Sequence, residues 1–229
     1  MKPFQIISLN GVDVAYSGSD RPAIQDINLD IPSRKLVLIT GPNGAGKTTL
    51  VETCLGLLKP LKGEAYLFGV NTKSRRIRDA RRRCSYVPQD FMKPPFEAYT
   101  VKRVIQLGLA PFKSVFESPS SHEDKLIEEV ARLLEIEDLL DKPIGALSGG
   151  QQQRVVIARA IARKPRVLFL DEPFSSLDKE GRELISRVAE EYVEREGGTV
   201  IMVSHDINPI IGYADVVVKM DDGRIVDKL

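Results

Sequence analysis

The chain has 229 residues, 42% of them hydrophobic, which is enough to fold around a sizeable core. Its 33 lysine and arginine residues nearly balance 32 aspartate and glutamate residues, leaving a net charge of +1. This balance excludes a surface that attracts nucleic acid or an anionic membrane everywhere, so any charged partner must be recognised locally. No apolar run approaches the roughly 20 residues of a membrane-spanning helix, and the first residues lack the features of an export signal. We therefore expect a cytoplasmic protein.

The two cysteines, Cys54 and Cys84, stand 30 residues apart and belong to no CxxC or Cys/His pattern. This spacing is typical of reduced structural thiols and predicts neither a disulfide nor a metal site. The chain has only two histidines besides, so the sequence offers no recognisable site for a metal cargo.

The first predicted elements are short strands at residues 4–9, 12–16 and 24–31, in which apolar and polar residues alternate. Such strands are buried on one face and are typical of an antiparallel sheet. Continuous apolar runs follow at residues 36–40, 167–170, 200–203 and 216–218. Because both faces of these strands are apolar, they predict a second, parallel sheet in the centre of the protein.

Helical patterns lie between the buried strands, most clearly at residues 179–196, where Gly197 and Gly198 end the helix. Strand and helix alternate, so the core is predicted to be α/β. Residues 99–146 show helix after helix without a buried strand. We therefore predict one domain, with residues 1–98 and 147–229 forming the core and an N-terminal antiparallel β-subdomain, and residues 99–146 an inserted α-helical subdomain.

A glycine-rich loop at residues 41–48 matches the G-x-x-x-x-G-K-[ST] pattern of a P-loop, between a buried strand and a predicted helix at residues 48–58. Its backbone N–H groups can face phosphate oxygens, while Lys47 supplies a positive charge and Thr48 an oxygen ligand for magnesium. The glycine order differs from the G-x-G-x-x-G of dinucleotide sites. The predicted ATP-binding residues here are Gly41, Pro42, Asn43, Gly44, Ala45, Gly46, Lys47, Thr48 and Thr49.

Two adjacent carboxylates, Asp171 and Glu172, follow the buried run at residues 167–170. Ligands bind at the carboxyl ends of parallel strands, so this pair is placed for chemistry. In P-loop enzymes such an aspartate shares magnesium with the loop hydroxyl. We assign Asp171 to magnesium with Thr48, and Glu172 to the activation of water as a general base.

His205 directly follows the run at residues 200–203, and at that sheet edge it could reach the terminal phosphate. A structural role is the alternative for a single histidine. Gln89 carries a neutral amide that could contact both metal and water, although the residue by itself is weak evidence.

Leu147-Ser-Gly-Gly-Gln151 makes the sequence more specific than a general P-loop protein. Ser148 and Gln151 form an S-x-x-Q capping box, and Gly149 and Gly150 expose the backbone at a second helix start suited to an anion. With Tyr16, the P-loop, Gln89, the acidic pair, the segment Ser175-Ser-Leu-Asp178 and His205 in this order, the chain resembles the ABC ATPase family over almost its whole length.

The resemblance implies a role for each matching position. Tyr16 would stack on adenine, Gln89 would link magnesium to a transmembrane partner, and Asp178 would lie in a loop that meets a second subunit. Ser148 and Gly150, with Gly149 and Gln151, would contact ATP held by the opposing subunit. Since the chain has one P-loop and one signature, the active species would be a head-to-tail homodimer with two ATP molecules between its subunits.

Two segments remain ambiguous. Residues 73–83 hold seven basic residues and could suggest nucleic acid, but a solvated helix is favoured because no aromatic residues interleave with them. An apolar, proline-broken stretch comprises Phe91, Met92, Pro94, Pro95, Phe96 and Tyr99. It is either core packing or a surface groove that receives a short helix from a membrane subunit, as the family arrangement implies.

We expect an ATPase subunit of a membrane importer, peripheral on the inner face of the membrane, with transmembrane permease subunits and, indirectly, a substrate-binding protein as partners. The stretch from Leu147 to Pro173, together with Ser204-His-Asp-Ile-Asn-Pro209, resembles ATPases of zinc and manganese uptake systems. Iron-chelate or cobalamin uptake is the alternative cargo, and a soluble ATPase of iron–sulfur cluster assembly the alternative class. The cargo, the permease and the direction of transport are not determined by these residues.

Overall fold

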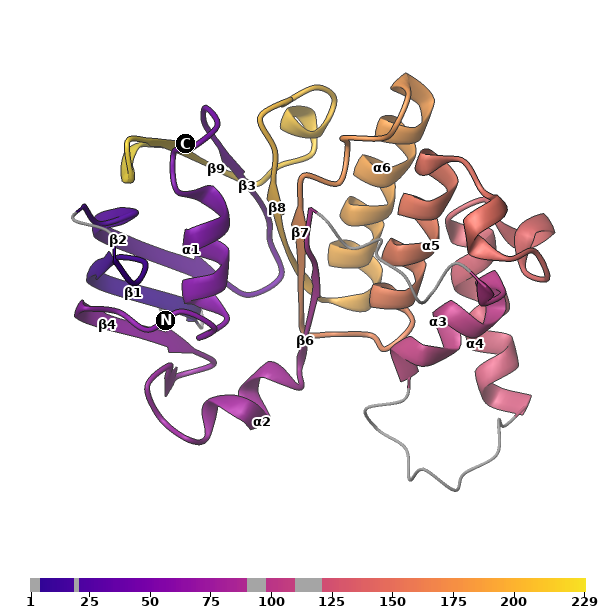
Figure 1. Cartoon of the computed structure of the whole chain (residues 1–229), viewed down its shortest axis with the longest axis horizontal. Helices are drawn as coiled ribbons and strands as arrows, with labels where there is room; N and C mark the ends of the chain where they lie inside the picture. Colours follow the sequence, from indigo (N-terminus) through magenta and orange to yellow (C-terminus); the bar gives the residue numbers. More distant parts are fainter. Residues whose placement is uncertain (1–4, 19–20, 90–97, 110–120) are drawn as a thin grey trace.

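The computed structural model describes residues 5–18, 21–89, 98–109 and 121–229, which form two β-sheets and the helices that cover them (Figure 1). The N-terminal sheet is antiparallel, with strand order β2-β1-β4-β5. Its strands are β1 (Gln5–Val14), β2 (Ile24–Pro32), β4 (Lys62–Leu67) and β5 (Val70–Asn71). The antiparallel N-terminal sheet is therefore confirmed.

Two of the predicted N-terminal strands are one. Residues 4–9 and 12–16 were expected as separate strands, whereas β1 continues from Gln5 to Val14. The pairing with β2 shifts register between Leu9 and Val12, on either side of Gly11, whose φ is +56°. The glycine allows a bulge that bends the strand without ending it.

The central sheet has strand order β10-β9-β3-β8-β7-β6 and is parallel except for β10. All five residues of β3, β7 and β8 are buried, as expected for parallel strands covered on both faces. The strands are β3 (Leu36–Thr40), β6 (Cys84–Val87), β7 (Val167–Asp171), β8 (Thr199–Val203), β9 (Val216–Asp221) and β10 (Arg224–Lys228). The sequence did not predict β6 or β10.

Helix α1 (Lys47–Cys54) lies between the two sheets, whereas α5 (Gly149–Ile161) and α6 (Lys179–Glu196) cover the opposite face of the central sheet (Figure 1). Each face has its own apolar core. The bounds predicted for α6 are confirmed, and Gly197 caps its end with a φ of +64°. Helix α1 was expected to reach Leu58 but ends at Cys54, because Gly56 turns the chain with a φ of +68°.

Beyond the core lie short helices, and none of the helices that the structure describes is long and apolar enough to span a bilayer. Within the predicted helical subdomain, the described residues form α3 (Val101–Leu109), α4 (Ser121–Leu133) and two 3-10 turns, η3 (Glu137–Leu139) and η4 (Ile144–Ala146). Elsewhere lie α2 (Ile77–Arg81) and η5 (Ile210–Gly212). The subdomain boundaries at 99 and 146 stay a prediction.

The central sheet should dominate stability, and Phe169 in β7 tests this because its side chain is fully buried. Replacing Phe169 with Ala leaves a cavity between the sheet and α1, and we expect a loss of about 3–5 kcal/mol in the free energy of unfolding. Urea denaturation followed by circular dichroism measures it. Val226→Ala on β10 is the control, because Val226 is 62% exposed; equal effects of the two substitutions would contradict the expectation.

Candidate functional site

The loop from Gly41 to Thr48 joins β3 to α1 and depends on two glycines. Gly41 has a φ of +147°, and a Cβ there would lie 2.1 Å from the carbonyl oxygen of Met220. Gly46 has a φ of +90°, and its Cβ would lie 2.7 Å from the carbonyl oxygen of Ala23. Only glycine fits both the left-handed backbone and the close approach of neighbouring chain segments. The loop is therefore held in one wrapped conformation at the start of α1.

The Lys47 side chain is 7% exposed and folds back over this loop. Its Nζ donates hydrogen bonds to the carbonyl oxygens of Gly41, at 2.8 Å, and Pro42, at 3.0 Å. The same Nζ lies 3.8 Å from Oε1 of Glu172. A positive charge is thus fixed at the loop, facing a carboxylate from a different strand.

Asp171, the last residue of β7, is linked to the loop by a hydrogen bond. Its Oδ2 accepts from Thr48 Oγ1 at 2.8 Å and from the Tyr86 hydroxyl at 3.3 Å. Burial raises the pKa of the Asp171 carboxyl, and these two hydrogen bonds act in the opposite direction. Its Oδ1 is buried and has no hydrogen-bond partner among the described residues. A hydroxyl and a carboxylate oxygen without a partner fit the oxygen ligands that magnesium prefers.

Glu172 follows at once, with a φ of +49° that turns its side chain out of the strand line. Its Oε2 lies 2.8 Å from Nδ1 of His205 and accepts a longer hydrogen bond, of 3.4 Å, from the His205 backbone N–H. The Glu172 side chain is 8% exposed and that of His205 is 57% exposed. Lys47 and His205 therefore hold the two oxygens of one largely buried carboxylate, and the histidine remains open to the cleft.

A cleft of about 440 Å³ lies beside these residues. It brings together most of the side chains that the sequence singled out, and Gln89 and Tyr16 line it although both are exposed. The Tyr16 hydroxyl lies 2.9 Å from Thr49 Oγ1 in α1. The lining residues are Tyr16, Ala23, Asn43, Gly44, Gly46, Lys47, Thr48, Thr49, Gln89, Glu172 and His205.

The structure does not bring the Leu147–Gln151 signature to this cleft. The predicted capping box is confirmed: Gln151 N–H donates to Ser148 Oγ at 3.3 Å, and Ser148 N–H donates to Gln151 Oε1 at 3.0 Å. The signature stands at the start of α5, on the other side of the central sheet from α1 (Figure 1). A Cβ at Gly150 would lie 3.0 Å from the carbonyl oxygen of Ser176, so the signature packs on the loop that follows the acidic pair.

That loop ends at Asp178, which caps α6. Asp178 Oδ1 accepts a hydrogen bond from the Gly181 N–H at 2.8 Å. Within a single chain, Asp178, which was predicted to face a second subunit, thus stabilises the start of α6.

Sequence reasoning missed Ala23, which lines the cleft, and two residues near it, Tyr86 and Glu52. The hydroxyl of Tyr86 in β6 donates a hydrogen bond to Asp171. Glu52 lies in α1, and the pKa of its carboxyl is raised by burial first and then by the charge of Asp171. The only hint to Tyr86 in the sequence is its position three residues before Gln89. Its partner could not be read from the sequence, because it depends on β6 pairing with β7.

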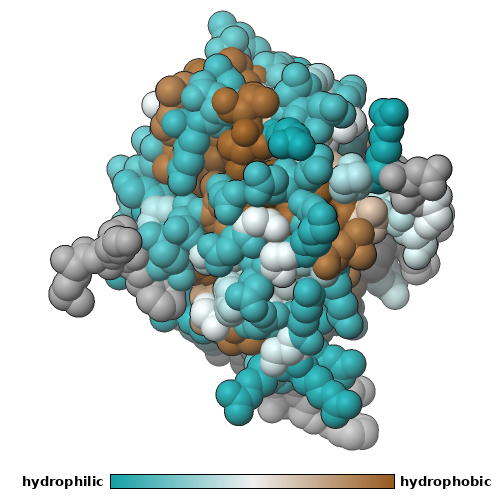
Figure 2. Space-filling model, turned by 90° about the vertical axis from the view of Figure 1, so that its left-hand side faces the viewer, coloured by the Kyte–Doolittle hydropathy of each residue, from teal (hydrophilic) through white to brown (hydrophobic). Residues whose placement is uncertain are grey.

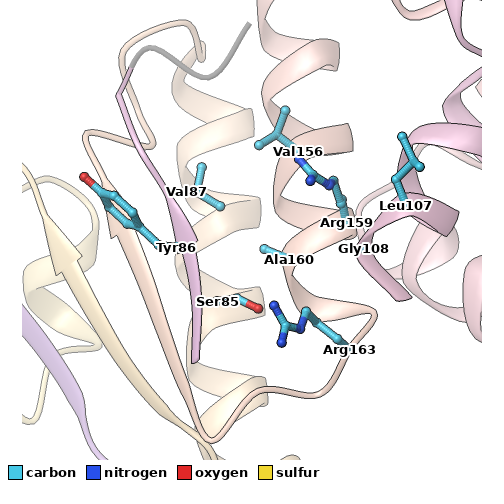
Figure 3. A pocket seen from close by; sticks show the side chains of 9 residues that line it. All are labelled: Ser85, Tyr86, Val87, Leu107, Gly108, Val156, Arg159, Ala160 and Arg163. Carbon is cyan, nitrogen blue, oxygen red and sulfur yellow. The ribbon is translucent and has the colours of Figure 1, made fainter. Parts of the chain in front are cut away.

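A second pocket, of about 130 Å³, lies between β6, α3 and α5 (Figure 3). Arg159 extends along it from α5 and Arg163 from the turn after that helix, and the Ser85 hydroxyl points toward Arg163 (Figure 3). A Cβ at Gly108 would lie 2.3 Å from the carbonyl oxygen of Arg159, so α3 and α5 meet closely here. The pocket therefore marks the junction between the core and the helices of residues 99–146.

The sequence matches a known protein family. The profile described as ABC transporter matches residues 24–175, which is more than half of the chain. The chain belongs to the ABC transporter family. The match includes the loop, the signature and the acidic pair, and the chain is an ATP-binding subunit of such a transporter and an ATPase.

Individual relatives cover nearly the whole chain. The high-affinity zinc uptake system ATP-binding protein ZnuC of Bacillus subtilis is 34% identical, over 93% of this chain and 90% of its own length. The manganese transport system ATP-binding protein MntB of the same organism is 35% identical, over 91% of this chain and 80% of its own length. A sulfate/thiosulfate import ATP-binding protein, CysA 1 of Agrobacterium fabrum, is also 35% identical. The match covers 89% of this chain but only 58% of the length of CysA 1.

Solved structures share the fold. CbiO1 of Clostridium perfringens, part of the transporter complex cbiONQ, has a TM-score of 0.84 at 31% identity, covering 98% of this chain and 88% of its own. The cassette MJ0796, in a dimeric post-hydrolysis state with ADP and phosphate, has a TM-score of 0.84 at 29% identity, covering 97% of each chain. The α/β fold with a P-loop core is thereby confirmed.

The backbone of the loop should be indispensable for nucleotide binding. We expect Gly46→Ala to lower the affinity for a fluorescent ATP analogue at least tenfold, because the new Cβ would displace the loop from Ala23 and Ile24. Titration of fluorescence anisotropy measures the affinity. Gly212→Ala, at a glycine with no atom within 4 Å of its Cβ position, is the control. Unchanged binding by a folded Gly46→Ala variant would overturn the account of the loop.

Proposed function

We propose that the cleft binds ATP with its triphosphate in the loop of residues 41–48. The positive end of α1 and the Lys47 charge, both at the loop, support this placement. Lys47 would exchange its bonds to the Gly41 and Pro42 carbonyls for phosphate oxygens, which it can do without moving far. Tyr16 lies on the same cleft and is 47% exposed, leaving its ring free to stack on the adenine.

We propose that Thr48 and Asp171 hold magnesium, together with Gln89 when the site closes. The buried Oδ1 of Asp171 that lacks a partner supports this assignment. Bound magnesium would neutralise charge on the phosphate oxygens. Tyr86 has a positioning role, since its hydroxyl holds Oδ2 of the same carboxylate.

We propose that Glu172 is the general base. Its carboxylate accepts the proton of the attacking water as the water oxygen forms a bond to the terminal phosphorus and the bond to the ADP oxygen breaks. The buried position of Glu172 between Lys47 and His205 supports this role, because the two contacts fix the orientation of its carboxylate beside the cleft. His205 orients Glu172 through Nδ1 and is exposed enough to reach the terminal phosphate.

We propose that the complete site forms only in a head-to-tail homodimer. Ser148, Gly149, Gly150 and Gln151 lie outside the cleft of their own chain, so they are available to the ATP of a second copy. The dimeric state of the similar cassette MJ0796 supports this arrangement. ATP would close the two chains on each other, and hydrolysis would release them.

We propose that the homodimer drives an importer of zinc or manganese, bound to transmembrane permease subunits on the inner face of the membrane and supplied by a substrate-binding protein. The zinc and manganese ATPases support this cargo, because this chain covers 90% and 80% of their lengths against 58% of the sulfate relative. The predicted docking stretch at Phe91 to Phe96 lies outside the described residues. Tyr99 beside it is 42% exposed.

Replacement of the base should separate binding from turnover. We expect Glu172→Gln to lower ATP hydrolysis by about 100-fold or more, because the amide cannot accept the proton, and to accumulate an ATP-bound dimer. Phosphate release and size-exclusion chromatography with ATP measure the two effects. Glu194→Gln, on the exposed side of α6, should behave like the parent chain. A Glu172→Gln variant that hydrolyses ATP at the normal rate would remove Glu172 from this role.

Co-purification tests the transporter assignment. Expressed with the membrane proteins encoded beside it, the tagged chain should recover a polytopic permease after detergent extraction. Tyr99→Asp should lower the recovered permease several-fold, whereas Ile211→Asp, at an equally exposed side chain, should not. Recovery of soluble partners alone would favour the iron–sulfur assembly class. If uptake of an oxyanion, and not of zinc or manganese, stimulated the ATPase activity, the metal cargo would be excluded.

A further inference from the structure

The segment from Lys73 to Arg83 has no part in the ATP site. It contains seven basic residues and one acidic residue, for a net charge of +6, so the other 218 residues together carry a net charge of −5. The neutral total therefore conceals a strong separation of charge. Six of the basic side chains belong to exposed residues, and we call them the basic face: Lys73, Arg75, Arg76, Arg78, Arg82 and Arg83.

Packing of α2 fixes the direction of this face. Ile77 and Ala80 are 6% and 5% exposed and attach the helix to the core between the sheets. The arginines on either side of them must then point outward. In Figure 2, hydrophilic side chains project at the lower end of the view, at the height where α2 lies in Figure 1.

The charges on the basic face have little compensation. Arg82 Nη1 lies 3.8 Å from Oδ1 of Asp79, in a pair whose side chains are 72% and 78% exposed, so the pair contributes little. Arg83 lies over the ring of Phe68, 4.1 Å from its centroid, which orients the charge without neutralising it. Arg75, Arg76 and Arg78 stand close together at the start of α2, so their like charges repel one another. An anionic surface would relieve this repulsion.

An apolar side chain accompanies the basic face. The turn after α1 packs on α2, since a Cβ at Gly56 would lie 2.8 Å from Ile77 Cγ1. Leu57, the next residue, is 47% exposed. Basic side chains beside an exposed leucine are typical of surfaces that enter the headgroup region of a bilayer. Single-stranded nucleic acid is less suited, because it needs exposed aromatic rings, and Phe68 is covered by Arg83.

We propose that the basic face binds the anionic phospholipid headgroups of the membrane. This inference rests on the proposed location at the membrane and adds which face of the subunit meets the bilayer. The face lies at the amino ends of the parallel strands, where Arg83 O accepts a hydrogen bond from Arg166 N–H at the start of β7. The proposed ATP cleft lies at the carboxyl ends, because Lys47, Glu172 and His205, which line it, follow β3, β7 and β8. Lipid contact therefore leaves the nucleotide accessible, and the net negative charge of the remainder orients the chain with α2 toward the bilayer.

Vesicle flotation with the full chain tests the proposal. We expect the chain to float with phosphatidylcholine vesicles that contain about one-third phosphatidylglycerol, to stay unbound with pure phosphatidylcholine, and to dissociate as salt rises. Replacing Arg75, Arg76, Arg78 and Arg82 with Gln should lower the partition coefficient at least tenfold, since each basic residue near such a surface adds a factor of about five. The double variants Arg75→Gln/Arg76→Gln and Arg78→Gln/Arg82→Gln should be intermediate and guard against misfolding.

The matched control removes four exposed charges elsewhere, with Lys125, Arg132, Arg187 and Arg195 replaced by Gln, and should float like the parent chain. Equal binding to neutral vesicles, retained binding by the Arg75–Arg82 variant, or equal loss in the control would overturn the proposal. So would a chain that ignores vesicles but binds a labelled oligonucleotide through the same arginines. The flotation assay needs neither ATP nor permease. Its result is therefore independent of the ATPase and co-purification experiments, and the two proposals can fail separately.

Discussion

The parallel arrangement of three neighbouring strands is the constraint on which the site depends. β3, β8 and β7 lie side by side and end at one edge of the sheet, so the phosphate loop, His205 and Asp171-Glu172 emerge together. The backbone continues this order one step further, because Ser204 N–H donates to Ile39 O at 3.1 Å and Glu172 N–H to Val203 O at 2.9 Å. A slip of one residue in any of these strands would turn its side chains to the other face.

Most of the buried charged side chains that the structure describes also lie at this edge of the sheet. Among the described lysine, arginine, aspartate and glutamate residues, four are buried, and three of them, Lys47, Asp171 and Glu172, meet here. Burying a charge is costly unless it is paired and hydrogen-bonded. Two backbone carbonyls hold Lys47, Thr48 and Tyr86 hold Asp171, and His205 holds Glu172. The partners are therefore part of the site, because they supply the contacts that burial takes away from water.

The molecule divides its tasks between distant surfaces. The proposed nucleotide cleft lies at one end of the central sheet, the signature helix α5 stands across the sheet from α1, and exposed arginines gather at the opposite end beside α2. Such separation suits the proposed binding of ATP, a second copy of the chain and a membrane, since no surface would have to serve two partners. The near-zero net charge conceals this organisation, because opposite charges are separated in space and cancel only in the sum.

Local patterns in the sequence determined the pieces: the loop of residues 41–48, the buried strands, the capping box at Ser148 and the end of α6. Each depends on side chains a few residues apart, which the sequence displays directly. Tertiary structure alone decided that β8 lies between β3 and β7, and that Tyr86 holds Asp171. It also turned the four-residue segment β6 into a strand. These features depend on contacts between residues far apart in the chain, and no local periodicity records them.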